Sequence, residues 1–338
     1  MASEGNPVLR VLGQVVLAFI GFFALMFFLG LFVLGLGAGI GAALGAGGEA
    51  VDGEGPYVHV SGEKGSADRL LKITVEGLIL GSPPREGDFY WDAFADVTYG
   101  YAVQDALRAA AEDDAIKGVL LHLRTPGGTI FGSRAIHDGV MAFRRSERPV
   151  VAWIEGLSAS GGVMAMVGAD AIYADHGSFV GSIGVIGPVL TYFDQPVATE
   201  GGILGGGVVT RDGIEQIIVH AGRGKDLGNP FRRPTAEELA NLQAGLDHEY
   251  DAFVAHVAEH RHIEPEAIRQ AMGAQIFDNA TAEGYGLIDG TRSRDEALAA
   301  LAELAGVAES YQLVRPRKHA TSFWQLMSAR LGLAPGLP

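Results

Sequence analysis

Four segments rich in glycine and serine carry residue types that could do acyl-transfer chemistry. They are LHLRTPGGTI (121–130), VVAWIEGLSASGGVMAMVGADAIYAD (150–175), GSFVGSIGVIG (177–187) and HAGRGKDLGNPFRRPT (220–235). In the second segment, Ser160 precedes Gly161 at the expected start of a helix, where a nucleophilic hydroxyl and a backbone N–H for an oxyanion can lie side by side. Taken alone, a serine there is also typical of a helix cap, and a glycine-rich loop is typical of an ordinary turn.

Cysteine and lysine usage narrows the candidate chemistry. Cysteine is absent from the 338 residues, which excludes a thiolate nucleophile, thiolate-bound zinc and a disulfide framework. Lysine is rare, because 20 of the 25 basic side chains are arginine. A lysine, unlike an arginine, can become a neutral general base when it is desolvated. Lys225 lies in the fourth segment and is a candidate for that role, although most lysines in loops are simply solvated.

The elements that must position these segments follow an alternating pattern. Strands are predicted at 70–75, 119–123, 150–154 and 172–174, and helices at 102–112, 133–144 and 161–167. Strand–helix alternation predicts an α/β domain with a largely parallel sheet. In such a sheet, the loops that follow the carboxyl ends of the strands are the expected place for a site.

A long helix is predicted after residue 235. Thr235 and Glu238 have the spacing of a capping box, which marks the beginning of a helix. Apolar residues then recur at steps of three or four: Leu239, Leu242, Leu246, Tyr250, Phe253 and Val257. This spacing predicts a single apolar face along the helix.

The order of these motifs resembles that of the SppA-type signal peptide peptidases, a serine–lysine protease family with the ClpP/crotonase fold. PGG, ASGG, GSIGVIG and a G-x-x-K-D-x-G-x-P-F-R segment follow one another and precede a long helix. The resemblance covers roughly residues 68–295 and continues through QIF (275–277), AEG (282–284) and GLID (286–289). It implies an α/β fold of repeated ββα/βαβ units in the short, single-domain form of the family.

The resemblance also implies a role for each matching residue. Ser160 would be the nucleophile and Lys225 the general base, while Ser182 would form a hydrogen bond near the lysine amine. Gly161 and the Gly127-Gly128 pair, Gly128 in particular, would supply the N–H groups of an oxyanion hole. The implied substrates are residual signal peptides and other apolar peptide segments. The implied assembly is a homo-oligomer whose sites take Ser and Lys from neighbouring protomers.

Two positions depart from the family's pattern. Thr125 stands before PGG where the family usually has serine, and Val163 and Met164 follow ASGG where the family usually has aromatic residues. Neither departure removes an atom that the implied chemistry needs. We expect both to reshape substrate pockets.

An apolar segment near the amino terminus predicts a membrane anchor. Gln14 is the only polar side chain from residue 11 to residue 36, and these 26 residues would span about 39 Å as a helix, more than the ~30 Å of a bilayer core. A cleaved leader is the alternative, although its apolar region is usually shorter. The expected organisation is a cytoplasmic amino terminus (1–10), a transmembrane anchor (11–36), a Gly-rich linker (37–67), a peptidase domain (68–300) and a tail (301–338).

Charge bears on partners and on topology. The net charge of −15 belongs to residues 49–338, which hold 24 basic and 39 acidic side chains. That excess argues against a nucleic-acid surface, because such a surface needs a basic footprint. Arg10 precedes the apolar segment and acidic residues follow it, so the positive-inside rule predicts a single-pass protein of the inner or cell membrane with an extracytoplasmic peptidase domain.

Two other site chemistries stay open. Residues 256–260 read H-x-x-E-H, an inverted zinc-protease pattern that places His256 and His260 on one helix face. His262 is too near in sequence for an obvious third ligand and no distal acidic helix is evident, so we expect neither a metal nor another cofactor. A Ser-His-Asp triad would pair Ser160 with His176 or His220, but no spacing specifies it.

The expected function is therefore a membrane-anchored serine endopeptidase with a Ser160–Lys225 dyad, which acts on peptide substrates and binds no nucleic acid. Two alternatives remain. One is a crotonase-like acyl-CoA enzyme on the same fold, which needs neither the membrane segment nor the Ser–Lys pair. The other is a catalytically silent membrane scaffold that binds apolar peptides.

Overall fold

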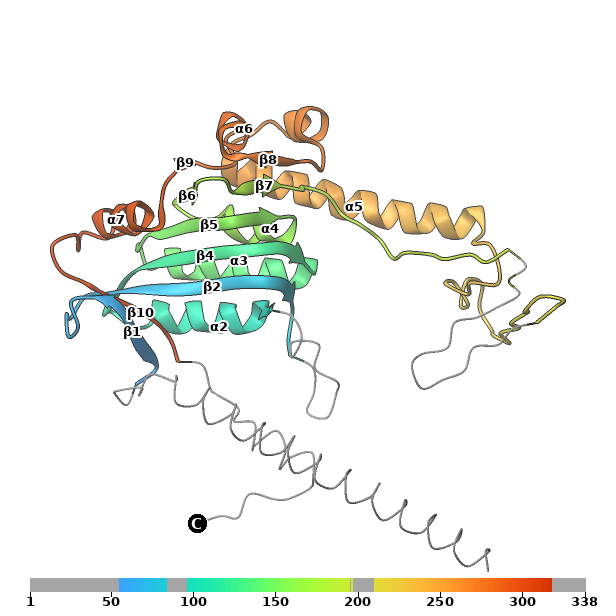
Figure 1. Cartoon of the computed structure of the whole chain (residues 1–338), viewed down its shortest axis with the longest axis horizontal. Coiled ribbons are helices and arrows are strands. Elements are labelled where there is room, and N and C mark those ends of the chain that lie inside the picture. Colours follow the sequence, from blue (N-terminus) through green and yellow to red (C-terminus); the bar gives the residue numbers. More distant parts are fainter. Residues whose placement is uncertain (1–54, 84–95, 195, 197–209, 318–338) are drawn as a thin grey trace, which may run out of the picture. The chain divides into compact units, whose positions relative to one another are not determined.

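The computed structural model describes residues 55–83, 96–194, 196 and 210–317 (Figure 1). The predicted anchor at 11–36 lies outside the described residues. Among those that are described, no helix is long and apolar enough to cross a membrane. The chain divides into two compact units, Met1–Val58 and His59–Pro338. The second unit contains every described element except the first two residues of β1 (Tyr57–Gly62).

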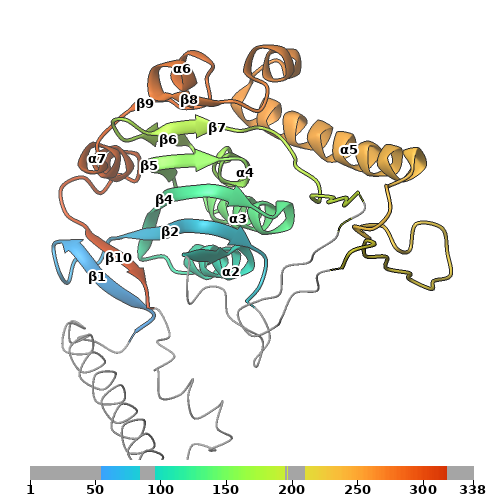
Figure 2. The same cartoon turned by 45° about the vertical axis from the view of Figure 1, so that its right-hand side comes forward.

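A largely parallel sheet forms the body of the second unit (Figures 1 and 2). Its centre consists of β2 (Arg69–Leu80), β4 (Ile116–Gly128), β5 (Val150–Ala159) and β6 (Ala171–Ala174), each parallel to the next. The core of these strands is aliphatic and fully buried, as parallel strands covered on both faces require. The predicted α/β architecture with a largely parallel sheet is therefore confirmed.

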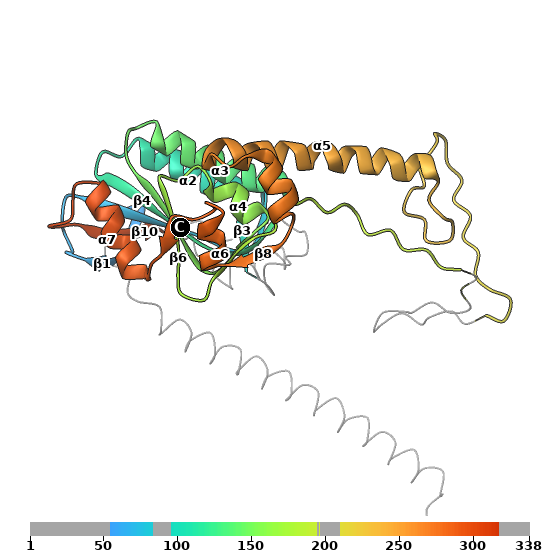
Figure 3. The ribbon, with the colours of Figure 1, turned by 90° about the horizontal axis from the view of Figure 1, so that it is seen from above.

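Helices connect these strands and cover the sheet (Figure 3). In chain order they are α2 (Gly100–Ala111), α3 (Ile130–Arg144) and α4 (Gly161–Met166), each close to its predicted range. The face of the sheet opposite these helices packs against α7 (Arg294–Leu304). Ala297 and Leu301 of α7 share a core cluster with Leu70 and Leu120. The α4 helix begins directly at the carboxyl end of β5, so residue 160 stands at a strand-to-helix corner.

Shorter strands complete the sheet. Its main order is β1-β10-β2-β4-β5-β6-β9, with β9 at Gly290–Thr291 and β10 at Gln312–Pro316. Beside this path, β3 (Val97–Tyr99) pairs with β2, and β7 (Phe179–Gly181) pairs parallel to β5 and antiparallel to β8 (Ile276–Asp278). The domain boundary drawn at residue 300 falls inside α7, and β10 lies within the segment expected to be a tail.

The long helix α5 (Ala236–Arg261) begins at the predicted capping box, where Thr235 and Glu238 exchange side-chain and backbone hydrogen bonds. Only the carboxyl-terminal part of its apolar face is buried, at Phe253, Val254 and Val257. Leu239, by contrast, is 47% exposed. A π-helix (Ala267–Met272) and α6 (Asn279–Gly284) follow α5 and lead to β9.

Candidate active site

Ser160 occupies the corner between β5 and α4 in a backbone conformation that side chains rarely adopt. Its φ is 52° and its ψ is −116°. Two backbone hydrogen bonds hold this corner, from the Ser160 N–H to the Gly181 carbonyl (2.9 Å) and from the Met164 N–H to the Ser160 carbonyl (3.1 Å). The hydroxyl does not cap α4 and makes no hydrogen bond with any described residue. The corner therefore presents a free hydroxyl, and the alternative of a simple helix cap is wrong.

The three predicted glycines lie directly against Ser160. A Cβ built on Gly127 would stand 2.6 Å from the Gly161 nitrogen and 2.9 Å from the Ser160 Cβ. One built on Gly161 would stand 3.0 Å from the Gly128 nitrogen and would collide with the Ser133 hydroxyl. The N–H groups of Gly128 and Gly161 are thus close to one another beside Ser160. Gly127 also has a φ of 99°, so both space and conformation demand glycine there.

Thr125 fixes the loop that carries these glycines. Its hydroxyl donates to the Gly77 carbonyl of β2 at 2.6 Å and accepts from the Gly127 N–H at 3.0 Å. Thr125 is fully buried, as is Val163, and Met164 is only 4% exposed. We expected these departures from the family's pattern to reshape substrate pockets. In the described chain their side chains are packed inside the fold, where Thr125 holds the PGG loop to the sheet, and the expected effect on substrate pockets stays a prediction.

Ser182 lies one residue beyond the backbone partner of Ser160. Gly181 ends β7, which pairs with β5 in the register Ala159 to Gly181. Ser182 also has a positive φ, 57°, and its N–H donates to the Gln275 carbonyl at 2.6 Å. The sheet thereby places Ser182 next to the Ser160 corner, as a residue that assists at this site would need to be.

Lys225 lies on a different part of the chain, in a turn that precedes α5. Arg232 ties this turn to the helix, because its guanidinium binds Asp226 at 2.6 Å and Glu238 at 2.7 Å. Hydrogen bonding to Arg232 lowers the pKa of Asp226 to about 2, so the carboxylate stays charged. The Lys225 side chain is exposed and makes no ion pair with a described residue.

The length of α5 separates this turn from Ser160 within one chain. The helix contacts the body through its carboxyl-terminal part, where the His256 ring lies 3.0 Å from the Met164 carbonyl of α4. The helix rises about 27 Å from Ala236 to Val254, at about 1.5 Å per residue. Figures 1 and 2 show the turn segment at the amino-terminal end of α5, away from β5 and α4. The described chain does not bring Lys225 to Ser160.

The histidines considered for a Ser-His-Asp triad lie elsewhere. The His176 side chain is 74% exposed and contacts the neighbouring Asp175. His220 lies 3.3 Å from Asp226, in the same turn segment as Lys225. Neither makes a hydrogen bond to Ser160 in the described part of the chain, so no triad is assembled there.

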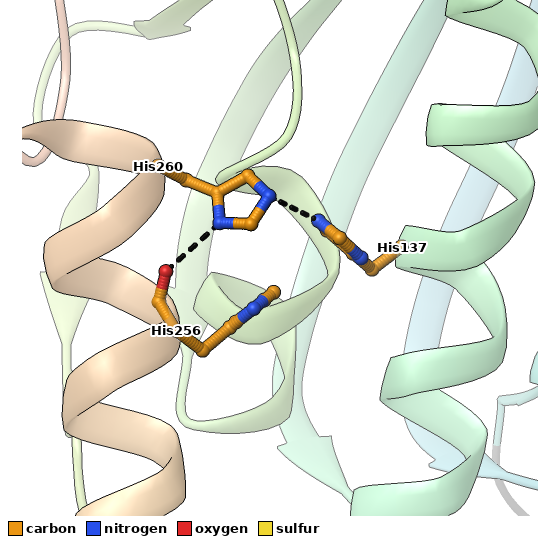
Figure 4. A group of neighbouring side chains, drawn as sticks. All are labelled: His137, His256 and His260. Atoms are coloured by element: carbon orange, nitrogen blue, oxygen red, sulfur yellow. Dashed lines mark hydrogen bonds between the residues drawn. The ribbon is translucent and has the colours of Figure 1, made fainter.

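The H-x-x-E-H pattern on α5 meets a third histidine in the fold (Figure 4). His137 of α3 joins His256 and His260, and one ring nitrogen from each lies within 4.8 Å of the others. Burial lowers the pKa of His137 to about 3 and that of His256 to about 4, so both rings are neutral near pH 7. Sequence reasoning missed His137, because it lies 123 residues before His260 and no local motif marks it.

Comparison with known proteins adds a second line of observation. Residues 142–308 match the model of peptidase family S49. The chain is 36% identical over 197 residues to a "Putative protease" of Methanocaldococcus jannaschii, covering 58% of this chain and 59% of that protein. It is 28% identical over 240 residues to the "Putative signal peptide peptidase SppA" of Enterococcus faecium, covering 71% of this chain and 64% of that protein.

The chain spans about three fifths of the length of these two relatives, 59% and 64%. Among solved structures, a mutant of the 1510-N membrane-bound stomatin-specific protease aligns with a TM-score of 0.40 and 15% identity, over 70% of this chain and 84% of that one.

Proposed function

We propose that this chain is a serine protease of peptidase family S49, whose model matches residues 142–308, and that it hydrolyses peptide bonds with a Ser160–Lys225 dyad. One observation carries the proposal: a free serine hydroxyl at a strained strand-to-helix corner, beside the N–H groups of Gly128 and Gly161. Strained backbone of this kind costs about 1–3 kcal/mol and persists where the surrounding structure enforces it, typically at functional sites.

The chemistry follows from these groups. The neutral Lys225 amine takes the Ser160 proton while the Ser160 oxygen attacks the substrate carbonyl carbon. The oxyanion that forms accepts hydrogen bonds from the Gly128 and Gly161 N–H groups. Lys225 returns its proton to the leaving amine as the peptide bond breaks. Water then attacks the acyl-enzyme carbonyl and loses a proton to Lys225, which passes it to the Ser160 oxygen as the ester bond breaks. Ser182 orients the lysine amine by a hydrogen bond.

The dyad is proposed to form between two copies of the chain. In a single copy Lys225 is exposed and sits at the far end of α5 from the helix's contact with α4, whereas a lysine base must be desolvated. The same region exposes large apolar side chains, with Ile217 at 78%, Val219 at 94% and Leu239 at 47%. Association with a neighbouring protomer would cover this surface and bring one copy's Lys225 to the other's Ser160.

The proposed substrates are residual signal peptides and other apolar peptide segments. A relative named as a signal peptide peptidase supports this choice. So does the apolar run from residue 11 to residue 36, which would anchor the enzyme in the inner or cell membrane with its peptidase domain outside the cytoplasm. Cleavage at the bilayer surface would place the site where such peptides accumulate.

Turnover of a fluorogenic signal-peptide-like substrate by the full chain in detergent tests the proposal. We expect Ser160→Ala and Lys225→Ala each to lower kcat/KM by at least about a thousandfold, since loss of either dyad member removes the nucleophilic route. Ser310→Ala and Lys117→Ala are matched controls of the same residue types outside the site and should retain activity.

Each other outcome argues against the dyad. Activity retained in Ser160→Ala or Lys225→Ala would refute the role of that residue. Peptide binding without cleavage by the assembled wild type would favour a silent scaffold, and turnover of an acyl-CoA would favour a crotonase-like enzyme.

A further inference from the structure

Three imidazoles converge between α3 and α5, on side chains that the proposed peptidase chemistry does not use. Their ring centroids are 4.4 to 4.7 Å apart, and His137 and His256 are 6% and 4% exposed. An open pocket of about 550 Å³ adjoins them and is also lined by Arg134, Asp138 and Glu259. Figure 4 shows His137 and His260 pointing at each other from the two helices.

Hydrogen bonds show which nitrogen of each α5 ring has a lone pair to offer. The Nδ1–H of His260 donates to the His256 carbonyl at 2.9 Å, which leaves Nε2 as the nitrogen that can offer a lone pair. The Nε2–H of His256 donates to the Met164 carbonyl at 3.0 Å, which leaves Nδ1. Ligating histidines characteristically donate their second N–H to a backbone carbonyl or a carboxylate, and both rings already do so.

His137 is poorly satisfied without a further partner. Its Nε2 lies 3.0 Å from the His260 Nε2, so one of these nitrogens must carry a proton for a hydrogen bond to form. With the proton on His137 Nε2, the buried Nδ1 has no hydrogen-bond partner among the described residues. If that proton moves to His137 Nδ1, the new N–H faces the Asp138 carboxylate, whose oxygen lies 3.6 Å from Nδ1. The Nε2 atoms of His137 and His260 then both have a free lone pair.

We propose that His137, His256 and His260 bind a first-row transition metal ion of the zinc class and that this ion fastens α5 to α3. Two nitrogens bound to one tetrahedral Zn²⁺ at about 2.0–2.1 Å lie about 3.3 Å apart, close to the 3.0 Å between His137 and His260. His256 Nδ1 completes a three-histidine set. The fourth position faces the open pocket, where water or the Glu259 carboxylate can fill it.

Arg134 competes with the ion. Its guanidinium lies 2.7 Å from His256 Nδ1 and so occupies the lone pair that the third ligand would offer. Arg134 is exposed and has room to turn into solvent. Metal binding therefore replaces the hydrogen bond between Arg134 and His256 with a coordinate bond. Removing the guanidinium should strengthen metal binding.

Two titrations test the site on the full chain, which is produced without a polyhistidine tag and treated with a chelator. Zn²⁺ binding is measured by calorimetry, and Co²⁺ binding by its visible spectrum. We expect one ion per chain and a tetrahedral Co²⁺ spectrum. Because loss of a mere supporting partner costs about 10–100-fold, His137→Gln and His260→Gln should each weaken binding by at least about 100-fold. His248→Gln, an exposed histidine on the same helix, is the control and should bind as the wild type does.

Arg134→Gln keeps the test decisive even if a histidine variant fails to fold. It alters only an exposed side chain and should bind Zn²⁺ more tightly than the wild type. Equal affinity in wild type, His137→Gln and His260→Gln would overturn the proposal. So would an Arg134→Gln variant that binds no more tightly than the wild type, or a wild type that binds no ion. None of these readouts depends on peptidase activity.

Discussion

Ser160 and the glycines around it show how closely one corner of the fold is packed. Gly127 fits between the backbone of residue 161 and the Ser160 Cβ. Its N–H donates a hydrogen bond to the Thr125 hydroxyl. A single added methyl group at Gly127 would push against the N–H proposed to hold the oxyanion. The site therefore requires a residue without a side chain at position 127 as well as the hydroxyl of Ser160.

Gly127→Ala should lose both stability and activity. The residue would pay about 1–2 kcal/mol for its positive φ and a further 1–3 kcal/mol for the overpacking. Displacing one oxyanion donor costs about 100- to 1,000-fold in kcat. Chemical unfolding and kcat of the purified variant check both expectations.

Gly156→Ala is the matched control for that substitution. Gly156 has a φ of 78°, but nothing lies within 4 Å of an added Cβ. Only the conformational cost of about 1–2 kcal/mol should remain, with kcat unchanged. Equal losses in the two variants would show that crowding at Gly127 is not what fixes the site.

The position and role of a site residue can be predicted from the sequence when its partners lie near it along the chain. Ser160, Gly161 and the PGG loop belong to contiguous motifs, so both their place at a strand-to-helix junction and their candidate roles could be stated beforehand. His137 has no motif of its own, and only the packing of α3 on α5 reveals it. The buried position of Thr125 was equally hidden, because its partner at Gly77 is 48 residues away.

Secondary-structure elements followed the periodicity of the sequence, with differences at their ends. β5 was predicted to end at residue 154 but runs to Ala159, because Ser158 still pairs with Thr125 of β4. Pairing of this kind is non-local, so hydrophobic pattern alone does not report it. The same reason applies to β10, which joins the sheet beside β2 from near the carboxyl-terminal end of the described chain.

The apolar face predicted for α5 divides into two parts with different expected roles. Phe253 is 2% exposed and anchors the helix to the body, whereas Leu239 has no such cover in the single chain. Phe253→Ala should lower the free energy of unfolding by about 3–5 kcal/mol. Leu239→Gln should change it by less than about 0.5 kcal/mol and weaken self-association instead.

Chemical unfolding and sedimentation of the full chain in detergent separate these two effects. Unimpaired association in Leu239→Gln would argue against a protomer contact at this end of α5. A large loss of stability in the same variant would show that Leu239 packs within its own chain.

In the complete chain, the two halves of the proposed dyad reside on different structural parts. Ser160 belongs to the sheet, and Lys225 to a turn held by Arg232 at the start of α5. Residues 142–308 match the model of peptidase family S49, and the strained corner supports the proposed nucleophile. The central claim of the proposal is that each active site takes Ser160 from one copy of the chain and Lys225 from another.

Mixing two inactive variants tests that claim most directly. Ser160→Ala and Lys225→Ala chains carrying different affinity tags are co-assembled, the mixed oligomers are isolated through both tags, and peptide turnover is measured. A site built across a heterologous contact is intact when it joins Ser160 of one variant to Lys225 of the other. We therefore expect at least about a quarter of wild-type activity per chain in the isolated mixed oligomers, rising to about a half if the oligomer is a dimer. Mixed oligomers that stay as inactive as either variant alone would contradict the shared site.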